Sequence, residues 1–195
     1  MSWQPPPHPQ VLQIKIKLLG VSKPPVWRRV QVRANTRLDQ LHEIVQILFG
    51  WYGYHLHAFS FGGAQYGVAN PELDFNDERK VRLNNLLSRG DQLRYVYDFG
   101  DNWEHGILVE DLLEADSRTR YPVLVTGKGA GPPEDCGGAW GYAELKEGVA
   151  TNRGDEQHLE TLKRLHREGG REFDPVAFDL DRIRAELAAR YNGGG

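Results

Sequence analysis

The sequence predicts an α+β fold with a mixed β-sheet, a β-grasp-like ββαβ first half and a helical C-terminal part. Three observations support this prediction. Two early segments, residues 11–19 and 26–33, alternate apolar and polar side chains as half-buried strands do. An amphipathic helical segment follows them and is itself followed by further strand-like segments. Beyond about residue 142, apolar residues recur at helical spacing.

Length and composition predict one folded domain. The chain has 195 residues, of which 39 % are hydrophobic, enough to bury a core. We expect residues 1–10 to form a flexible Pro-rich leader, residues 11–190 the α+β domain, and residues 191–195 a loose tail. No apolar run reaches the ~18 residues of a membrane span, and the leader lacks the features of a secretory signal. A single cysteine excludes an internal disulfide, so we expect a cytoplasmic protein without a membrane partner.

The first half begins with a predicted hairpin and helix. One face of the first strand carries Leu12, Ile14, Ile16 and Leu18. The turn "GVSKPP" leads to the second strand, and a helix follows over residues 35–50. Its apolar stripe consists of Leu38, Leu41, Val45 and Leu48, and Gly50 ends it. Hairpin followed by helix is how β-grasp-like domains begin.

The remaining elements follow from shorter patterns. Residues 55–63 are predicted to form a third strand, residues 62–80 a loop, and residues 84–90 a helical turn. Two further strands, at 91–99 and 103–110, are expected to reverse around Gly100–Asn102. A short strand at 121–126 leads to a glycine-rich loop at 127–142. Helical patterns then cover residues 142–150, 155–168 and 179–191.

Charge is distributed unevenly along the chain. Residues 1–38 contain basic residues and no acid, and residues 95–117 contain acidic residues and no base. We expect these segments to pair across the sheet. The alternative is a basic N-terminal hairpin that contacts nucleic acid through Lys15, Lys17, Arg28, Arg29 and Arg33.

The stretch "YVYDFGDNWEHGILVE" places many ionisable groups beside a tryptophan at a hairpin turn. His55 and His57 stand two apart in a predicted strand, so both are expected to face one side, where a further ligand could complete a metal site. Glu134 and Asp135 follow two prolines in the glycine-rich loop and could add carboxylates. The candidate binding groove therefore comprises His55, His57, Asp98, Asp101, Trp103, His105, Glu134 and Asp135. No cofactor is predicted; a divalent metal held by His55, His57 and His105 is the alternative.

Several stretches, in order from about residue 11 to residue 190, resemble one known family. They are "PPVWRRVQV", "LDQLHEIVQILFGWYGYHLHAF", "YVYDFGDNWEHGILVE", "GPPEDCGGAWGY" and "FDPVAFDLD". The chain is similar to the plasmid Ri ORF-three-like proteins, which also carry the names insertion-element passenger protein and resolvase. The resemblance implies an α+β fold and an association with mobile elements, but no particular reaction. Many members have cysteines where this chain has Leu124 and Gly131, so this chain cannot perform a thiol role at those positions.

The residues do not support recombinase chemistry. None of the early serines, Ser2, Ser22 and Ser60, lies in a cluster of arginines, and Tyr191 lacks an Arg-His-Arg set around it. We therefore predict a non-enzymatic binding or adaptor module with a protein or nucleic-acid partner. The alternatives are a metal-assisted hydrolase that uses His55, His57, His105, Asp98 and Asp101, and a nucleic-acid-binding protein that uses the basic hairpin.

Overall fold

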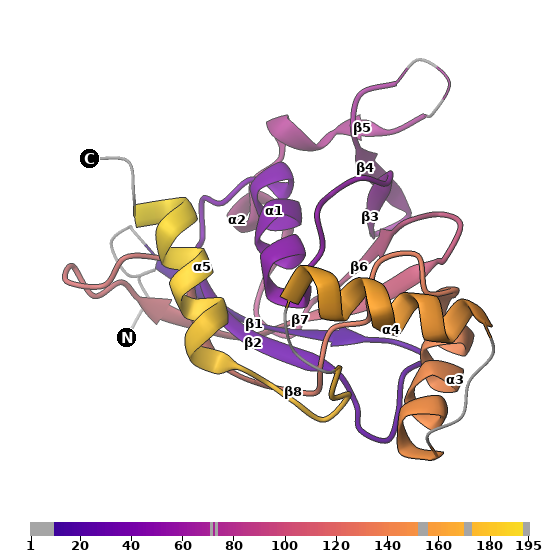
Figure 1. Ribbon diagram of the computed structural model, residues 1–195. Helices are drawn as coiled ribbons and strands as arrows, with labels where there is room; N and C mark the ends of the chain where they lie inside the picture. Colours follow the sequence, from indigo (N-terminus) through magenta and orange to yellow (C-terminus); the bar gives the residue numbers. More distant parts are fainter. Residues whose placement is uncertain (1–9, 71, 73, 152–155, 170–172, 193–195) are drawn as a thin grey trace, which may run out of the picture.

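An eight-stranded mixed sheet organises the protein, which we describe from a computed structural model covering residues 10–70, 72, 74–151, 156–169 and 173–192. The strand order is β5-β4-β3-β6-β7-β1-β2-β8 (Figure 1). Only the β4–β5 pair is parallel. The strands are β1 (Gln10–Leu18), β2 (Trp27–Arg33), β3 (His57–Phe61), β4 (Ala64–Gly67), β5 (Asn76–Asp77), β6 (Gln92–Tyr97), β7 (Trp103–Glu114) and β8 (Val123–Lys128).

Helices connect and cover this sheet, which confirms the predicted α+β class. The long helices of the described residues are α1 (Leu38–Phe49), α3 (Gly138–Thr151), α4 (Glu156–Gly169) and α5 (Leu180–Asn192). Two short ones, the 3-10 helix η1 (Glu78–Lys80) and α2 (Leu83–Leu86), follow β5. None of the described helices is long and apolar enough to cross a bilayer.

The first half has the predicted order of hairpin, helix and strand. Leu12, Ile14, Ile16 and Leu18 of β1 are buried, as their alternation requires. The α1 stripe lies against the same core, and Gly50 ends the helix in the left-handed conformation that glycine adopts without a Cβ clash (φ 79°). In Figure 1, α1 crosses the sheet, with α5 beside it and in contact with β8.

The segment 62–80 is more ordered than the sequence predicted. Gly62 and Gly63 have φ values of 58° and 83°, so they form the tight two-residue turn of a hairpin between β3 and β4. This glycine pair was the available signal for β4. β5 has only two residues and pairs with β4, so it carries no periodicity that a sequence pattern could reveal.

The predicted chain ends are only partly described. Of the Pro-rich leader, Gln10 begins β1, and residues 1–9 lie outside the described residues. Helix α5 continues through Tyr191 and Asn192, which the predicted tail had included. The Tyr191 hydroxyl contacts the Gln40 carbonyl of α1, and this contact gives the last turn a packing partner.

One ion pair joins the basic and acidic segments across the sheet over residues 10–38 and 95–117, all of which the structure describes. Arg29 on β2 reaches over β1 to Glu110 on β7 and forms two hydrogen bonds, of 2.5 and 2.8 Å. Arg28 behaves differently, because its side chain is only 2 % exposed and points into the core. Its guanidinium donates to the carbonyls of Leu48, Trp27, Lys128 and Gly129, and burial lowers its pKa to about 10.

Candidate functional site

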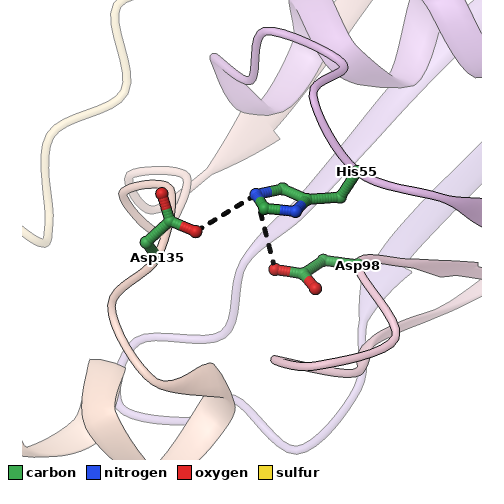
Figure 2. Close-up of side chains that lie close together, drawn as sticks. All are labelled: His55, Asp98 and Asp135. Carbon is green, nitrogen blue, oxygen red and sulfur yellow. Dashed lines mark ion pairs between the residues drawn. The ribbon is translucent and has the colours of Figure 1, made fainter.

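Four side chains from three separate parts of the chain converge at one end of α1. His55 lies in the segment between α1 and β3, and Asp98 lies in the turn between β6 and β7. Glu134 and Asp135 lie in the loop between β8 and α3. Figure 2 shows His55 pointing between Asp98 and Asp135. We call these four residues the carboxylate–histidine cluster.

The segment that carries His55 is fixed to the glycine-rich loop. The buried Trp51 indole donates through Nε1 to the Pro132 carbonyl, at 2.8 Å. Its ring also stacks on Phe49 and Tyr97, with centroids 5.3 and 4.9 Å away. These contacts bring His55 against the loop before α3.

The two carboxylate oxygens of Asp98 have different partners. It has a φ of 55°, in the left-handed region that Asp tolerates better than most residues, and its Oδ1 accepts a hydrogen bond of 2.9 Å from Gly100 N–H. Its backbone N–H donates to the Leu56 carbonyl, which ties the turn to the His55 segment. The other oxygen, Oδ2, lies 3.7 Å from His55 Nε2. The side chain that shapes the turn therefore also faces the imidazole.

Glu134 is buried, with 8 % of its surface exposed, and its two oxygens also differ. Oε1 accepts hydrogen bonds of 2.9 Å from the Tyr97 hydroxyl and from Tyr52 N–H. Oε2 has no hydrogen-bond partner among the described residues and lies 3.8 Å from His55 Nε2. Burial and the neighbouring Glu134 carboxylate raise the pKa of Tyr97, so its hydroxyl remains a donor at neutral pH. An oriented carboxylate with one free oxygen results.

Asp135 is the exposed member of the cluster. It has a φ of 55° and 57 % side-chain exposure, and its Oδ1 lies 3.1 Å from His55 Nε2. That distance is within hydrogen-bond range, yet His55 Nε2 makes no hydrogen bond of acceptable geometry to any described residue. The other Asp135 oxygen lies 3.9 Å from Arg164 of α4, whose guanidinium also donates to the Glu134 carbonyl. Arg164 thus anchors the loop from outside.

The arrangement has the composition of a site for a divalent cation. His55, Asp98 and Asp135 each offer one ligand atom, and these atoms lie within 4.8 Å of one another. One imidazole with carboxylates suits Mn²⁺, Fe²⁺ or Zn²⁺, since oxygen ligands favour harder ions and imidazole the transition metals. Three carboxylates around one imidazole also carry an excess of negative charge, which a cation would offset.

The other predicted histidines do not reach the cluster. β3 begins at His57, so His55 lies before the strand and does not share the face of His57, which corrects the expected pairing. His57 is buried and lies 2.8 Å from Glu78, and its ring stacks on His42 at 3.6 Å. His105 is fully buried against Phe49, and burial lowers its pKa to about 3.

Trp103 and Asp101 flank the site without joining it. Trp103 is 1 % exposed and packs in the core against Trp51 and Tyr142. Asp101 accepts a hydrogen bond of 3.2 Å from Gly137 N–H. This bond connects the hairpin turn to the start of α3 and so helps to position the loop that carries Glu134.

The five basic candidates do not form one surface. Arg28 is buried and Arg29 is paired with Glu110, while Lys15 lies over the Trp27 ring at 4.8 Å. Lys17 and Arg33 are at opposite ends of the β1–β2 hairpin, about 20 Å apart at 3.3 Å per residue. The five residues therefore do not share one exposed face, because Arg28 lies in the core.

The predicted site did not include three supporting residues, Tyr52, Tyr97 and Arg164. Tyr97 directly precedes Asp98 and stands two positions after Tyr95 in a strand, so both side chains face the same side, which is buried. This alternation was the available signal for Tyr97. No local pattern indicated Tyr52 or Arg164, because one acts through its backbone N–H and the other comes from a distant helix.

Comparisons with known proteins agree with the sequence resemblance. The chain is 35 % identical over 188 residues to the uncharacterized protein y4hQ of Sinorhizobium fredii (strain NBRC 101917 / NGR234), covering 93 % of this chain and 94 % of the relative. It is also similar to the crystal structure of MM3350, a protein of unknown function from Methanosarcina mazei Go1. The TM-score is 0.78 at 32 % identity, over 90 % of this chain and 98 % of the other. The family model of the plasmid pRiA4b ORF-3-like proteins matches residues 10–182, and the chain therefore belongs to that family.

Proposed function

We propose that this protein is a binding module that holds one divalent cation in the carboxylate–histidine cluster and binds its partner or ligand next to that cation. One observation carries the proposal. Glu134 Oε2 and His55 Nε2 lie 3.8 Å apart, both are enclosed, and neither has a hydrogen-bond partner among the described residues. A buried, unpartnered carboxylate oxygen is costly, and a shared cation would satisfy both atoms.

The spacing of the side chains supports a cation more than direct ion pairs. Ligands held at about 2.0–2.2 Å from a common ion lie roughly 3 Å apart along the edge of a coordination polyhedron. Asp135 Oδ1 is 3.1 Å from His55 Nε2 and does not satisfy hydrogen-bond geometry with it. The Tyr97 hydroxyl orients Glu134 from behind, as outer hydrogen bonds commonly orient metal ligands.

The surroundings favour binding over catalysis. Tyr52 and Tyr54 stack on each other with ring centroids 5.5 Å apart and are 61 % and 77 % exposed. Phe99, next to Asp98, is 45 % exposed. A ligand that reached the cation past the exposed Asp135 would therefore lie against aromatic surface. The hydrolase alternative requires His57 and His105 at the site, but both side chains are buried in the core.

Calorimetric titration of the metal-free protein with MnCl₂ and with ZnCl₂ tests the proposal. We expect one site per chain with a Kd of about 10 µM or tighter for at least one ion. Glu134→Gln and His55→Ala should each weaken binding at least about tenfold. Glu104→Gln is the matched control, because Glu104 is a nearby acid that lies beside Arg94 outside the cluster.

Two results would contradict this function. Absence of binding by either ion, or binding unchanged in both cluster variants, would remove the cation from the proposal. Metal-dependent hydrolysis of a chromogenic phosphodiester, lost in the same variants, would favour the metal-assisted hydrolase instead.

A further inference from the structure

A hollow lies at the opposite end of α1 from the carboxylate–histidine cluster. It has a volume of about 240 Å³ and lies between the end of β2, the first turn of α1 and the segment before β8. With twelve residues, α1 separates the two locations by about 18 Å. The polar lining includes Arg33, Arg37, Arg82, Asn35, Thr36 and Tyr121. We call this hollow the arginine pocket.

The backbone places two of these arginines opposite each other. Arg37 and Arg82 form an isolated antiparallel bridge, and the adjacent hydrogen bonds run from Leu83 N–H to the Thr36 carbonyl and from Leu38 N–H to the Val81 carbonyl. Like charges directly opposite each other across paired strands are unfavourable. The fold nevertheless holds them there, with Arg33 in the same lining.

Among the described residues, an acidic side chain pairs with only one of the three arginines. Arg37 forms two hydrogen bonds with Asp39, of 2.9 and 2.8 Å. Arg82 donates to the neutral Asn35 carbonyl, and Arg33 lies over the Tyr121 ring at 4.7 Å. Within the described part of the chain, no carboxylate pairs with Arg33 or Arg82. The pocket therefore carries uncompensated positive charge.

We propose that the arginine pocket binds a small phosphate-bearing molecule. Guanidinium groups pair bidentately with phosphate oxygens, and such charge-assisted hydrogen bonds are stronger than neutral ones. A dianionic phosphate monoester would offset the charge of Arg33 and Arg82 together. The volume accommodates a phosphate with a small organic group, which would lie beside Tyr121 and Pro122. This proposal does not depend on the metal site.

The test is a calorimetric titration of the full chain with inorganic phosphate and with ribose 5-phosphate, and with ribose as the uncharged comparison. We expect saturable binding of at least one phosphate compound at a Kd of about 1 mM or tighter, and none of ribose. Arg33→Gln and Arg82→Gln should each weaken it about tenfold or more. Arg79→Gln is the control, since Arg79 is a nearby exposed arginine paired with Asp77 outside the pocket.

Circular dichroism of each variant establishes that it is folded, and two independent variants protect the test against a local defect in one of them. Equal binding of ribose and ribose 5-phosphate, no binding below about 10 mM, or an equal loss in Arg79→Gln would overturn the proposal. Tighter, steeply salt-dependent binding of an oligonucleotide that ribose 5-phosphate cannot displace would also overturn it, in favour of a nucleic-acid surface.

Discussion

Glu134 Oε2 lies 3.8 Å from His55 Nε2, and both atoms are enclosed without a hydrogen-bond partner among the described residues. Oε1 of the same carboxylate accepts two hydrogen bonds, from Tyr97 and from the Tyr52 backbone. Glu134 is therefore held in one orientation with its free oxygen directed into the cluster.

Glu134→Gln should leave the metal-free protein as stable as wild type or more stable, and should make the metal-loaded protein less stable than wild type. Without metal, the amide removes a buried charge and can donate toward the neighbouring acids, so we expect an equal or higher melting temperature. With saturating Mn²⁺ or Zn²⁺, wild type should gain stability by mass action, and the variant should gain less, by about 1.4 kcal/mol for each tenfold loss of affinity. Thermal melts with and without EDTA measure both effects. A variant less stable than wild type in EDTA, with an undiminished metal response, would contradict the assignment.

Tyr97→Phe should reduce metal affinity through Glu134. The phenylalanine fills the same buried space but removes the hydrogen bond to Oε1, so we expect affinity to fall by about tenfold and stability by about 1 kcal/mol. Tyr95→Phe is the matched control, because its hydroxyl bonds to His42 and Gln46 away from the cluster. Calorimetry should find metal affinity unchanged in the control; equal losses in both variants would indicate a general packing effect.

Two histidines, the partly buried His42 and the fully buried His105, should make the protein sensitive to mild acid. Burial lowers the pKa of His42 and of His105 to about 3 from the usual 6.5, and for His42 the neighbouring His57 adds to the effect. Below pH 6.5 the unfolded chain binds protons that the folded chain excludes. The stability that the two neutral histidines contribute to the fold is therefore complete above pH 6.5. It is lost progressively between pH 6.5 and 3, at up to about 1.4 kcal/mol per pH unit for each histidine.

Urea unfolding at pH 7.5, 6 and 5 measures this loss. In His42→Gln, one of the two proton uptakes disappears, so the contribution of these histidines to the pH dependence should fall by about half. A wild-type unfolding free energy that stayed constant from pH 7.5 to pH 5 would mean that neither histidine is protonated on unfolding.

Arg28→Lys should destabilise the protein strongly despite the conserved charge. The guanidinium donates hydrogen bonds to carbonyls of β2, of α1 and at the end of β8, whereas one ammonium group cannot reach all of them. We expect the free energy of unfolding to fall by about 3 kcal/mol or more. Arg29→Lys, on the adjacent and partly exposed residue paired with Glu110, should cost under about 1 kcal/mol. Similar urea midpoints for the two variants would contradict this role.

Sequence patterns predicted the fold better than the site. The alternation of β1 and the apolar stripe of α1 report burial directly, because each reflects one face of a regular element. The two-residue β5 has no such period. The extended segment before β3 also continues the strand pattern, so the sequence could not place the strand start at His57 and separate it from His55.

The site itself depends on long-range packing. The sequence predicted all four residues of the carboxylate–histidine cluster as candidates. Nothing in their spacing along the chain distinguished these four from the other candidates, His57, Trp103 and His105. The four cluster residues converge only because the hairpin turn, the His55 segment and the glycine-rich loop meet in the fold. Arg82 was not a candidate at all, because its approach to Arg37 comes from an isolated bridge between distant segments.

The hydrogen bond from Trp51 to the Pro132 carbonyl has a spectroscopic consequence. The indole is attached to the same loop that carries Glu134 and Asp135, and its ring centroid lies 6.0 Å from that of Trp103. Any displacement of that loop changes the electric field at an excited indole, and a paramagnetic ion bound there quenches its emission. The fluorescence of Trp51 in the wild-type chain can therefore report changes at this loop, and metal titrations need no added label.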